Sequence, residues 1–212
     1  MEVIRSPTVV VAMEQFLPPD FPYAHTVEAF ERLSEKEREE SDAHEGVAPR
    51  LNQQLRLFQF ILTFSLRTAV RFRDMRADGT DLAYDVRVQQ PDGPIRGTEV
   101  HKDDGPYEGA VNRTMTISLL DGATNTVVYP NGPPNREHLP YTNAGSALYF
   151  DAMTDHSAPS TREVKAKRAV VYFSVIYDRA VTPAEEMAAL QMYLGVVRTS
   201  AEVEMQNDIR ST

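Results

Sequence analysis

The chain has 212 residues, of which 42% are hydrophobic and 25% are charged, a composition typical of a single globular domain. It contains no cysteine, which excludes disulfides, thiolate metal ligands and a cysteine nucleophile, so a metal would have to bind histidine and carboxylate groups. The net charge of −9 argues against nucleic acid as a partner, because binding phosphates requires a positively charged surface.

The first third of the chain predicts one strand followed by helices. The β-branched run in "PTVVVAMEQF" is typical of a strand, and Pro18 and Pro19 end it. Helix formers dominate from Tyr23 to about Arg38. Residues 48–74 then give a long helical pattern, with apolar residues three or four positions apart: Leu51, Leu55, Phe58, Leu62 and Leu66.

No segment of the sequence predicts a membrane span or a secretory signal. The longest apolar-rich stretch, "LRLFQFILTFSLRTAV", is interrupted by Arg56, Gln59 and Arg67. The first sixteen residues have neither a long apolar region nor a cleavage-type end. We therefore expect a cytoplasmic protein that does not bind membranes, and the sequence leaves its oligomeric state open.

From about residue 80 the pattern changes to strands. "DLAYDVRVQ" alternates between apolar and polar residues, and four further short β-rich segments follow, each bounded by turn residues: "RTMTISLLDG", "TNTVVYPNGPP", "AGSALYFDA" and "KRAVVYFSVIYD". Such strands without helices between them favour an antiparallel sandwich or barrel. We expect one mainly β domain with flanking helices (α+β): helical support at about 20–75, a β core at about 80–178 and a C-terminal helix at about 182–198, followed by a polar segment that frays.

Two histidines and one aspartate form a candidate metal-binding group. "EVHKDD" places His101 two residues before Asp103, and residues i and i+2 of a strand point to the same side. "DAMTDHSAP" adds His156 much later in the chain. Two histidines and one carboxylate make up the facial triad of non-haem iron(II) enzymes. An H-x-D pattern alone is common, and ordinary polar roles for these residues are the alternative.

Together these segments resemble the iron(II)- and 2-oxoglutarate-dependent oxygenases, in particular the prolyl-4-hydroxylase-like branch. "NAGSALYFDA" is similar to the strand that precedes the second histidine ligand in that family, and "SPTVVVAMEQFLPPDF" to its entry strand. The resemblance implies a double-stranded β-helix (jelly-roll, cupin-like) core supported by N-terminal helices. It also implies that His101, Asp103 and His156 bind Fe(II).

The resemblance further implies that a basic residue after the second histidine binds the remote carboxylate of the cosubstrate 2-oxoglutarate. Lys167 and Arg168 both stand at that place, and we favour Arg168 because the apolar strand begins directly after it. The implied reaction uses O2 to hydroxylate or otherwise oxidise an aliphatic C–H bond, with release of succinate and CO2.

The substrate expected from the compact, acidic chain is a small molecule, such as an amino acid or an amino-acid-derived metabolite. Two alternatives remain: a protein prolyl hydroxylase and a non-catalytic jelly-roll binding protein. The second is favoured by "GATNT", which stands where relatives carry a Gly-Gly-Glu-Thr element, and by the absence of their Arg-x-Ser pattern. Arg113 and Tyr84 could also line the pocket, but structural roles are more frequent for such residues.

Overall fold

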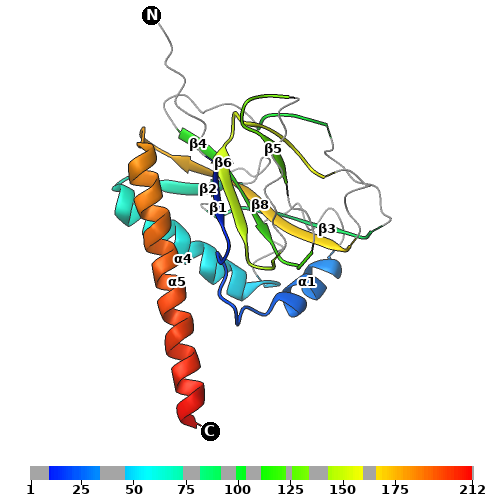
Figure 1. The fold of residues 1–212 in the computed structure, drawn as a ribbon, viewed down its shortest axis with the longest axis vertical. Coiled ribbons are helices and arrows are strands. Elements are labelled where there is room, and N and C mark those ends of the chain that lie inside the picture. Colours follow the sequence, from blue (N-terminus) through cyan, green and yellow to red (C-terminus); the bar gives the residue numbers. More distant parts are fainter. Residues whose placement is uncertain are drawn as a thin grey trace, which may run out of the picture.

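The structure, a computed structural model, describes residues 10–33, 46–73, 82–91, 99–103, 111–122, 126–133, 143–159 and 166–211. Within these ranges it has three helices, which are α1 (Tyr23–Glu31), α4 (Pro49–Leu66) and α5 (Pro183–Ser211) (Figure 1). The strands in the same ranges are β1 (Val10–Met13), β2 (Val70–Arg73), β3 (Asp85–Gln89), β4 (Val111–Ser118), β5 (Val127–Tyr129), β6 (Ala147–Asp151), β7 (Asp155–Ser157) and β8 (Arg168–Tyr177).

Six of these strands form one antiparallel sheet in the order β1-β6-β4-β8-β2, and β3 also pairs with β8. The ten residues of β8 are long enough for two partners along one edge. β2 pairs with its C-terminal end, where Val70 lies opposite Tyr177, and β3 pairs with its N-terminal end, where Gln89 lies opposite Arg168. β8 is therefore the central strand of the sheet.

The two faces of this sheet differ in chemistry because side chains alternate along each strand. On β4 and β8, one face consists of apolar residues such as Met115, Ile117 and Phe173, which pack into the main hydrophobic core with α4 and α5. The opposite face of the same strands carries Thr114 and Ser174, which lie directly across from each other. In Figure 1, α4 and α5 lie side by side on one side of the sheet, and β5 lies away from them.

Within the described residues, the second sheet consists of β5 and β7, and it covers the polar face of the large sheet. Val128 of β5 packs in a small apolar cluster with Leu148 and Phe150 of β6. The segment at His101 extends this small sheet through an antiparallel bridge to His156. The predicted α+β class with mainly antiparallel strands is therefore confirmed. In the described ranges the sheets are not closed, so the jelly-roll core stays a prediction.

The predicted long helix over 48–74 is wrong at its C-terminal end. The helix ends at Leu66, Arg67 takes a left-handed conformation with φ of 50°, and Val70–Arg73 forms β2. Tertiary pairing explains the difference, since β2 is held by the edge of β8 and Val70 O accepts a hydrogen bond from the Gln59 side chain at 2.9 Å.

The C-terminal helix is longer than predicted. α5 continues to Ser211, whereas we expected it to end near residue 198 and the polar segment after it to fray. The segment contains neither proline nor glycine, and Ala201, Glu202, Glu204, Met205 and Gln206 have high helix propensity, which favours continuation. Among the helices in the described ranges, none combines the length and the apolar character needed to cross a membrane. Part of the predicted first helix, residues 34–38, lies outside the described residues.

A buried ion pair attaches α5 to the sheet. Arg113 of β4 donates two hydrogen bonds to Glu186 of α5, at 2.9 and 2.8 Å, and a third to Asp151 at 2.8 Å. Tyr149 donates to Glu186 at 2.7 Å and also contacts the hydroxyl of Tyr177. Arg113 and Glu186 are both buried, so the charge of each residue is stabilised by the opposite charge of the other in place of water.

We predict that Glu186→Ala destabilises the fold by about 3–5 kcal/mol, because it leaves the Arg113 guanidinium buried without its bidentate partner. Urea unfolding followed by circular dichroism measures this loss. The matched control is Glu185→Ala, which removes the neighbouring, more exposed carboxylate that pairs with Arg179. An equally large loss in both variants would show that the buried pair has no special role.

Candidate metal centre

The fold brings His101, Asp103 and His156 together, as the sequence predicts. One ligand-type atom from each residue lies within 4.8 Å of those from the other two, so the group could hold a metal ion. Backbone hydrogen bonds hold the two segments in register: His101 N donates to His156 O at 2.9 Å, and His156 N donates to His101 O at 2.8 Å. Asp103 N donates to Ala152 O at 3.0 Å, which places its side chain beside the His156 ring.

Backbone carbonyls orient both imidazole rings. Nδ1 of His101 lies 2.8 Å from Glu99 O, and Nδ1 of His156 lies 3.0 Å from Thr154 O. A carbonyl only accepts, so each Nδ1 must carry the proton, and each Nε2 then has a free lone pair. This arrangement is the usual support of a metal-binding histidine. The edge of Phe150 packs on the His156 ring, with ring centroids 5.0 Å apart.

The carboxylate of Asp103 is buried between two partners. Its Oδ1 lies 3.4 Å from His156 Nε2, and its Oδ2 accepts a hydrogen bond from the Thr114 hydroxyl. Two ligand atoms that each lie about 2.1 Å from one metal ion, with their bonds at about 90° to each other, are about 3 Å apart. The 3.4 Å between Asp103 Oδ1 and His156 Nε2 therefore suits two neighbouring ligands of one ion. Asp103 and His156 are each 7% exposed, whereas His101 is exposed and forms the open side of the group.

The pKa values of the buried pair show that the site favours positive charge. Burial alone would raise the pKa of Asp103, but the hydrogen bond and charge of His156, with the Thr114 hydroxyl, lower it below its ordinary value. Burial alone would lower the pKa of His156, but Asp103 raises it. The carboxylate is therefore ionised and stabilises a cation beside it, which is the requirement for a metal ligand.

The two candidate cosubstrate residues lie in different environments. Arg168 begins β8 and is 5% exposed, and burial together with the nearby Arg87 lowers its pKa to about 10. Lys167 lies outside the strand, and its Nζ forms an ion pair with Glu31 of α1 at 2.6 Å. By strand alternation Arg168 shares the sheet face of Ser174 and Thr114, and therefore the face that carries the metal-binding group.

Sequence reasoning missed Thr114, the hydroxyl partner of Asp103. The signal for it was weak: Thr114 alternates with apolar Met115, which predicts only that it lies on the opposite face of the strand. The other two candidates are structural. Arg113 faces the helices and binds Glu186, while Tyr84 donates a hydrogen bond to Asn52 of α4 at 2.7 Å.

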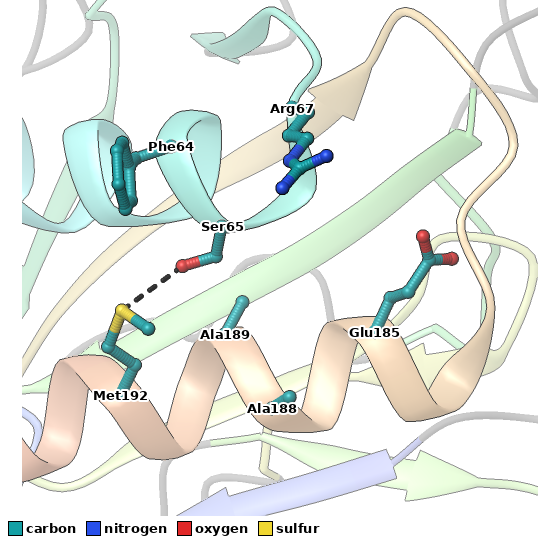
Figure 2. Close-up of a pocket in the computed structure, with 7 residues that line it drawn as sticks. All are labelled: Phe64, Ser65, Arg67, Glu185, Ala188, Ala189 and Met192. Carbon is teal, nitrogen blue, oxygen red and sulfur yellow. Dashed lines mark hydrogen bonds between the residues drawn. The ribbon is translucent and has the colours of Figure 1, made fainter.

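A groove of about 540 Å³ lies between the end of α4 and the start of α5, on the helix side of the sheet. Figure 2 shows the Ala188, Ala189 and Met192 side chains of α5 along it, with Phe64 and Arg67 on the α4 side and Glu185 at one end. The Ser65 hydroxyl bonds the Met192 sulfur at 3.2 Å. Because the metal-binding group lies on the opposite face of the sheet, this groove contributes nothing to it.

A search of protein-family models found no match to this chain, and a search of curated proteins found none either.

We predict that His101→Ala, Asp103→Ala and His156→Ala each weaken iron(II) binding at least about a hundredfold, because each removes a direct ligand and outer-shell changes alone cost 10- to 100-fold. Anaerobic equilibrium dialysis with metal analysis measures the affinity. His25→Ala removes an exposed histidine of α1 and serves as the control. If a variant keeps wild-type affinity for iron(II), the residue replaced in it is not a metal ligand.

Thr114→Val should weaken iron(II) binding by about 10- to 100-fold while it leaves the fold intact, because valine keeps the shape of threonine but loses the hydroxyl that holds Asp103. The same dialysis measures the change. Thr126→Val is the matched control, because Thr126 is another buried threonine and directly precedes β5. If both variants bind iron equally well, the hydroxyl of Thr114 does not support the ligand.

Proposed function

We propose that this chain is an iron(II)- and 2-oxoglutarate-dependent dioxygenase that oxidises an aliphatic C–H bond of a small molecule, with release of succinate and CO2. The observation that carries the proposal is the group formed by His101, Asp103 and His156. One ring nitrogen of each histidine and one carboxylate oxygen converge from two segments that are more than fifty residues apart, and each ring is oriented by a backbone carbonyl.

The donor set fits iron(II). Two imidazoles and one carboxylate on one side of an ion leave coordination positions open on the other side, which is the arrangement of the non-haem iron oxygenases. Iron bound there would supply the activation of O2 that is coupled to decarboxylation of the keto acid. The exposed His101 lies at the open side, and the buried Asp103 and His156 anchor the ion to the small sheet and to Thr114 of the large sheet.

Arg168 supplies a positive charge for the cosubstrate on the same sheet face. A buried guanidinium is costly unless an anion neutralises it, and a planar carboxylate matches its bidentate geometry. Lys167 is already paired with Glu31 at the protein surface and is the weaker candidate. The keto-acid end of 2-oxoglutarate would then face the metal, and its remote carboxylate would face Arg168.

The protein environment suits a reaction that must exclude water. The sheet face beneath the metal-binding group consists of buried side chains, including Phe150, Thr114 and Ser174. These residues hold the ligands and shield the reacting centre from solvent. We propose a small molecule such as an amino acid as substrate, because the net charge of −9 disfavours nucleic acid.

The test is anaerobic addition of iron(II) and 2-oxoglutarate to the purified protein. The visible charge-transfer absorption of an iron–keto-acid complex requires both the metal-binding group and the cosubstrate site. It should be absent from His156→Ala, which lacks a candidate metal ligand. Succinate release on admission of air, with a panel of free amino acids and a proline-containing peptide, then separates a small-molecule enzyme from a protein prolyl hydroxylase. Iron binding without the absorption or succinate would instead support a non-catalytic binding protein.

We predict that Arg168→Ala raises the 2-oxoglutarate concentration needed for half of this absorption by at least about tenfold, since losing a buried charge-assisted contact costs roughly 2–5 kcal/mol. Iron binding should stay unchanged. Lys167→Ala should have little effect, because a partly exposed ion pair contributes about 0–1 kcal/mol. The reverse ranking would assign the cosubstrate carboxylate to Lys167.

A further inference from the structure

A second arginine lies on the same sheet face as Arg168, on the strand that pairs with the other edge of β8 from β4. Arg87 of β3 lies directly opposite Val170 of β8, and Val86 and Val88 on either side of it pack into the core on the helix side. Alternation therefore directs Arg87 to the face of Arg168 and Ser174. Its position opposite Val170 is two residues along β8 closer to Ser174 than Arg168 is.

Tyr172 holds the Arg87 guanidinium in place. Arg87 Nε donates to the Tyr172 hydroxyl at 3.0 Å, and its guanidinium carbon lies 5.3 Å from the centre of the Tyr172 ring. Tyr172 is a further two residues closer to Ser174, and it also interacts with Asp85, which lies opposite it on β3. The Arg87 guanidinium therefore lies beside Tyr172, which is two residues from Ser174 along β8.

The length of the sheet face favours a contact for the cosubstrate that is nearer to the metal-binding group than the start of β8. Arg168 and Ser174 are six residues apart on one strand, which corresponds to about 20 Å. Ser174 lies opposite Thr114, the partner of Asp103. A five-carbon dicarboxylate bound to a metal at Asp103 is much shorter than this span. Its remote carboxylate would therefore lie near Tyr172 and the Arg87 guanidinium. Arg168, at the N-terminal end of β8, would contact it by extending its side chain along the sheet face.

The charges on this face also call for a dianion. Among the described residues that flank this region, Arg87 and Arg168 carry two positive charges, and Asp85 and Asp103 carry two negative charges. A divalent ion at the metal-binding group would bring the sum to +2. Two guanidinium groups and a metal ion on one face repel one another, and a ligand with two carboxylates would reduce this repulsion.

We propose that Arg87 and Arg168 together form a two-guanidinium clamp for the remote carboxylate of the cosubstrate, with Arg87 as the nearer contact and Tyr172 as its positioning residue. This inference rests on the proposed function for the identity of the ligand. It assigns selectivity for dicarboxylic over monocarboxylic keto acids to Arg87 as well as to Arg168.

Calorimetric titration of the manganese(II)-loaded protein tests the clamp with two probes, 2-oxoglutarate and 2-oxopentanoate, which lacks only the remote carboxylate. Arg87→Gln should weaken 2-oxoglutarate binding at least about tenfold and leave 2-oxopentanoate binding unchanged, because only the dicarboxylate contacts the guanidinium. Arg87→Lys should recover part of the affinity. Tyr172→Phe, which removes only the hydroxyl, should cost about 2- to 10-fold for 2-oxoglutarate.

The control is Arg71→Gln on β2, which removes an exposed arginine paired with Asp178 and should change neither affinity. Equal weakening of both keto acids by Arg87→Gln, or no change in either, would overturn the clamp. An increase in the affinity for 2-oxoglutarate in Arg87→Gln would also overturn it.

A second arm separates failure of the clamp from failure of the proposed function. The metal-free protein is titrated with glutarate, the five-carbon dicarboxylate without a keto group. If iron and 2-oxoglutarate give no charge-transfer absorption but glutarate binds and is weakened at least about tenfold by Arg87→Gln, the proposed function fails and the dicarboxylate clamp stands. If the absorption forms and Arg87→Gln changes neither 2-oxoglutarate nor glutarate binding, the clamp fails and the proposed function stands.

Discussion

The ion pair between Arg113 and Glu186 is the interaction on which both halves of the structure depend. Burying one of these charges without the other would cost several kcal/mol, so the sheet and α5 are stable only in contact. Arg113 also binds Asp151, whose other oxygen accepts a hydrogen bond from Met153 N at 2.9 Å. One guanidinium thus fixes the last helix and the turn that leads from β6 to the second histidine.

This turn links the Arg113 ion pair on the helix side of the sheet to the metal-binding group on the opposite side. Ala152, between Asp151 and Met153, accepts the hydrogen bond of Asp103 N, so the backbone beside Arg113 also places the carboxylate of the metal-binding group. The helix face of the sheet supplies apolar burial and the Arg113–Glu186 pair, and the opposite face supplies Thr114, Ser174 and Arg168. The same strands carry both roles because neighbouring residues point in opposite directions.

Periodicity was sufficient to predict the classes of element but not their ends. The alternation in β3 and the spacing of apolar residues in α4 follow directly from which residues enter the core, and both were predicted. The change from helix to strand after Leu66 was not, because nothing local stops the helix: Arg67 adopts a left-handed conformation that glycine usually takes, and the pairing partner of β2 lies at the other end of the chain.

The candidate site was predictable to the extent that it depends on residue types. Histidine and aspartate at i and i+2, with a distant second histidine, identified the group that the fold brings together. Thr114 and Arg87 could not be recognised in advance, because their roles depend on which strands are neighbours. The register places Thr114 beneath Asp103 and directs Arg87 toward Tyr172, and register is a property of the assembled sheet.

The central position of β8 has a consequence for how the chain reaches this structure. β2, β3 and β4 all pair with a strand that is synthesised after them, and Arg71 meets Asp178 across 107 residues. During translation β2 and β3 are therefore synthesised before β8, the strand with which they pair. Closing the long loops between β8 and these two strands slows folding. The unpaired edges of those early strands are the parts of the nascent chain most exposed to intermolecular pairing, until the last third of the protein has emerged from the ribosome.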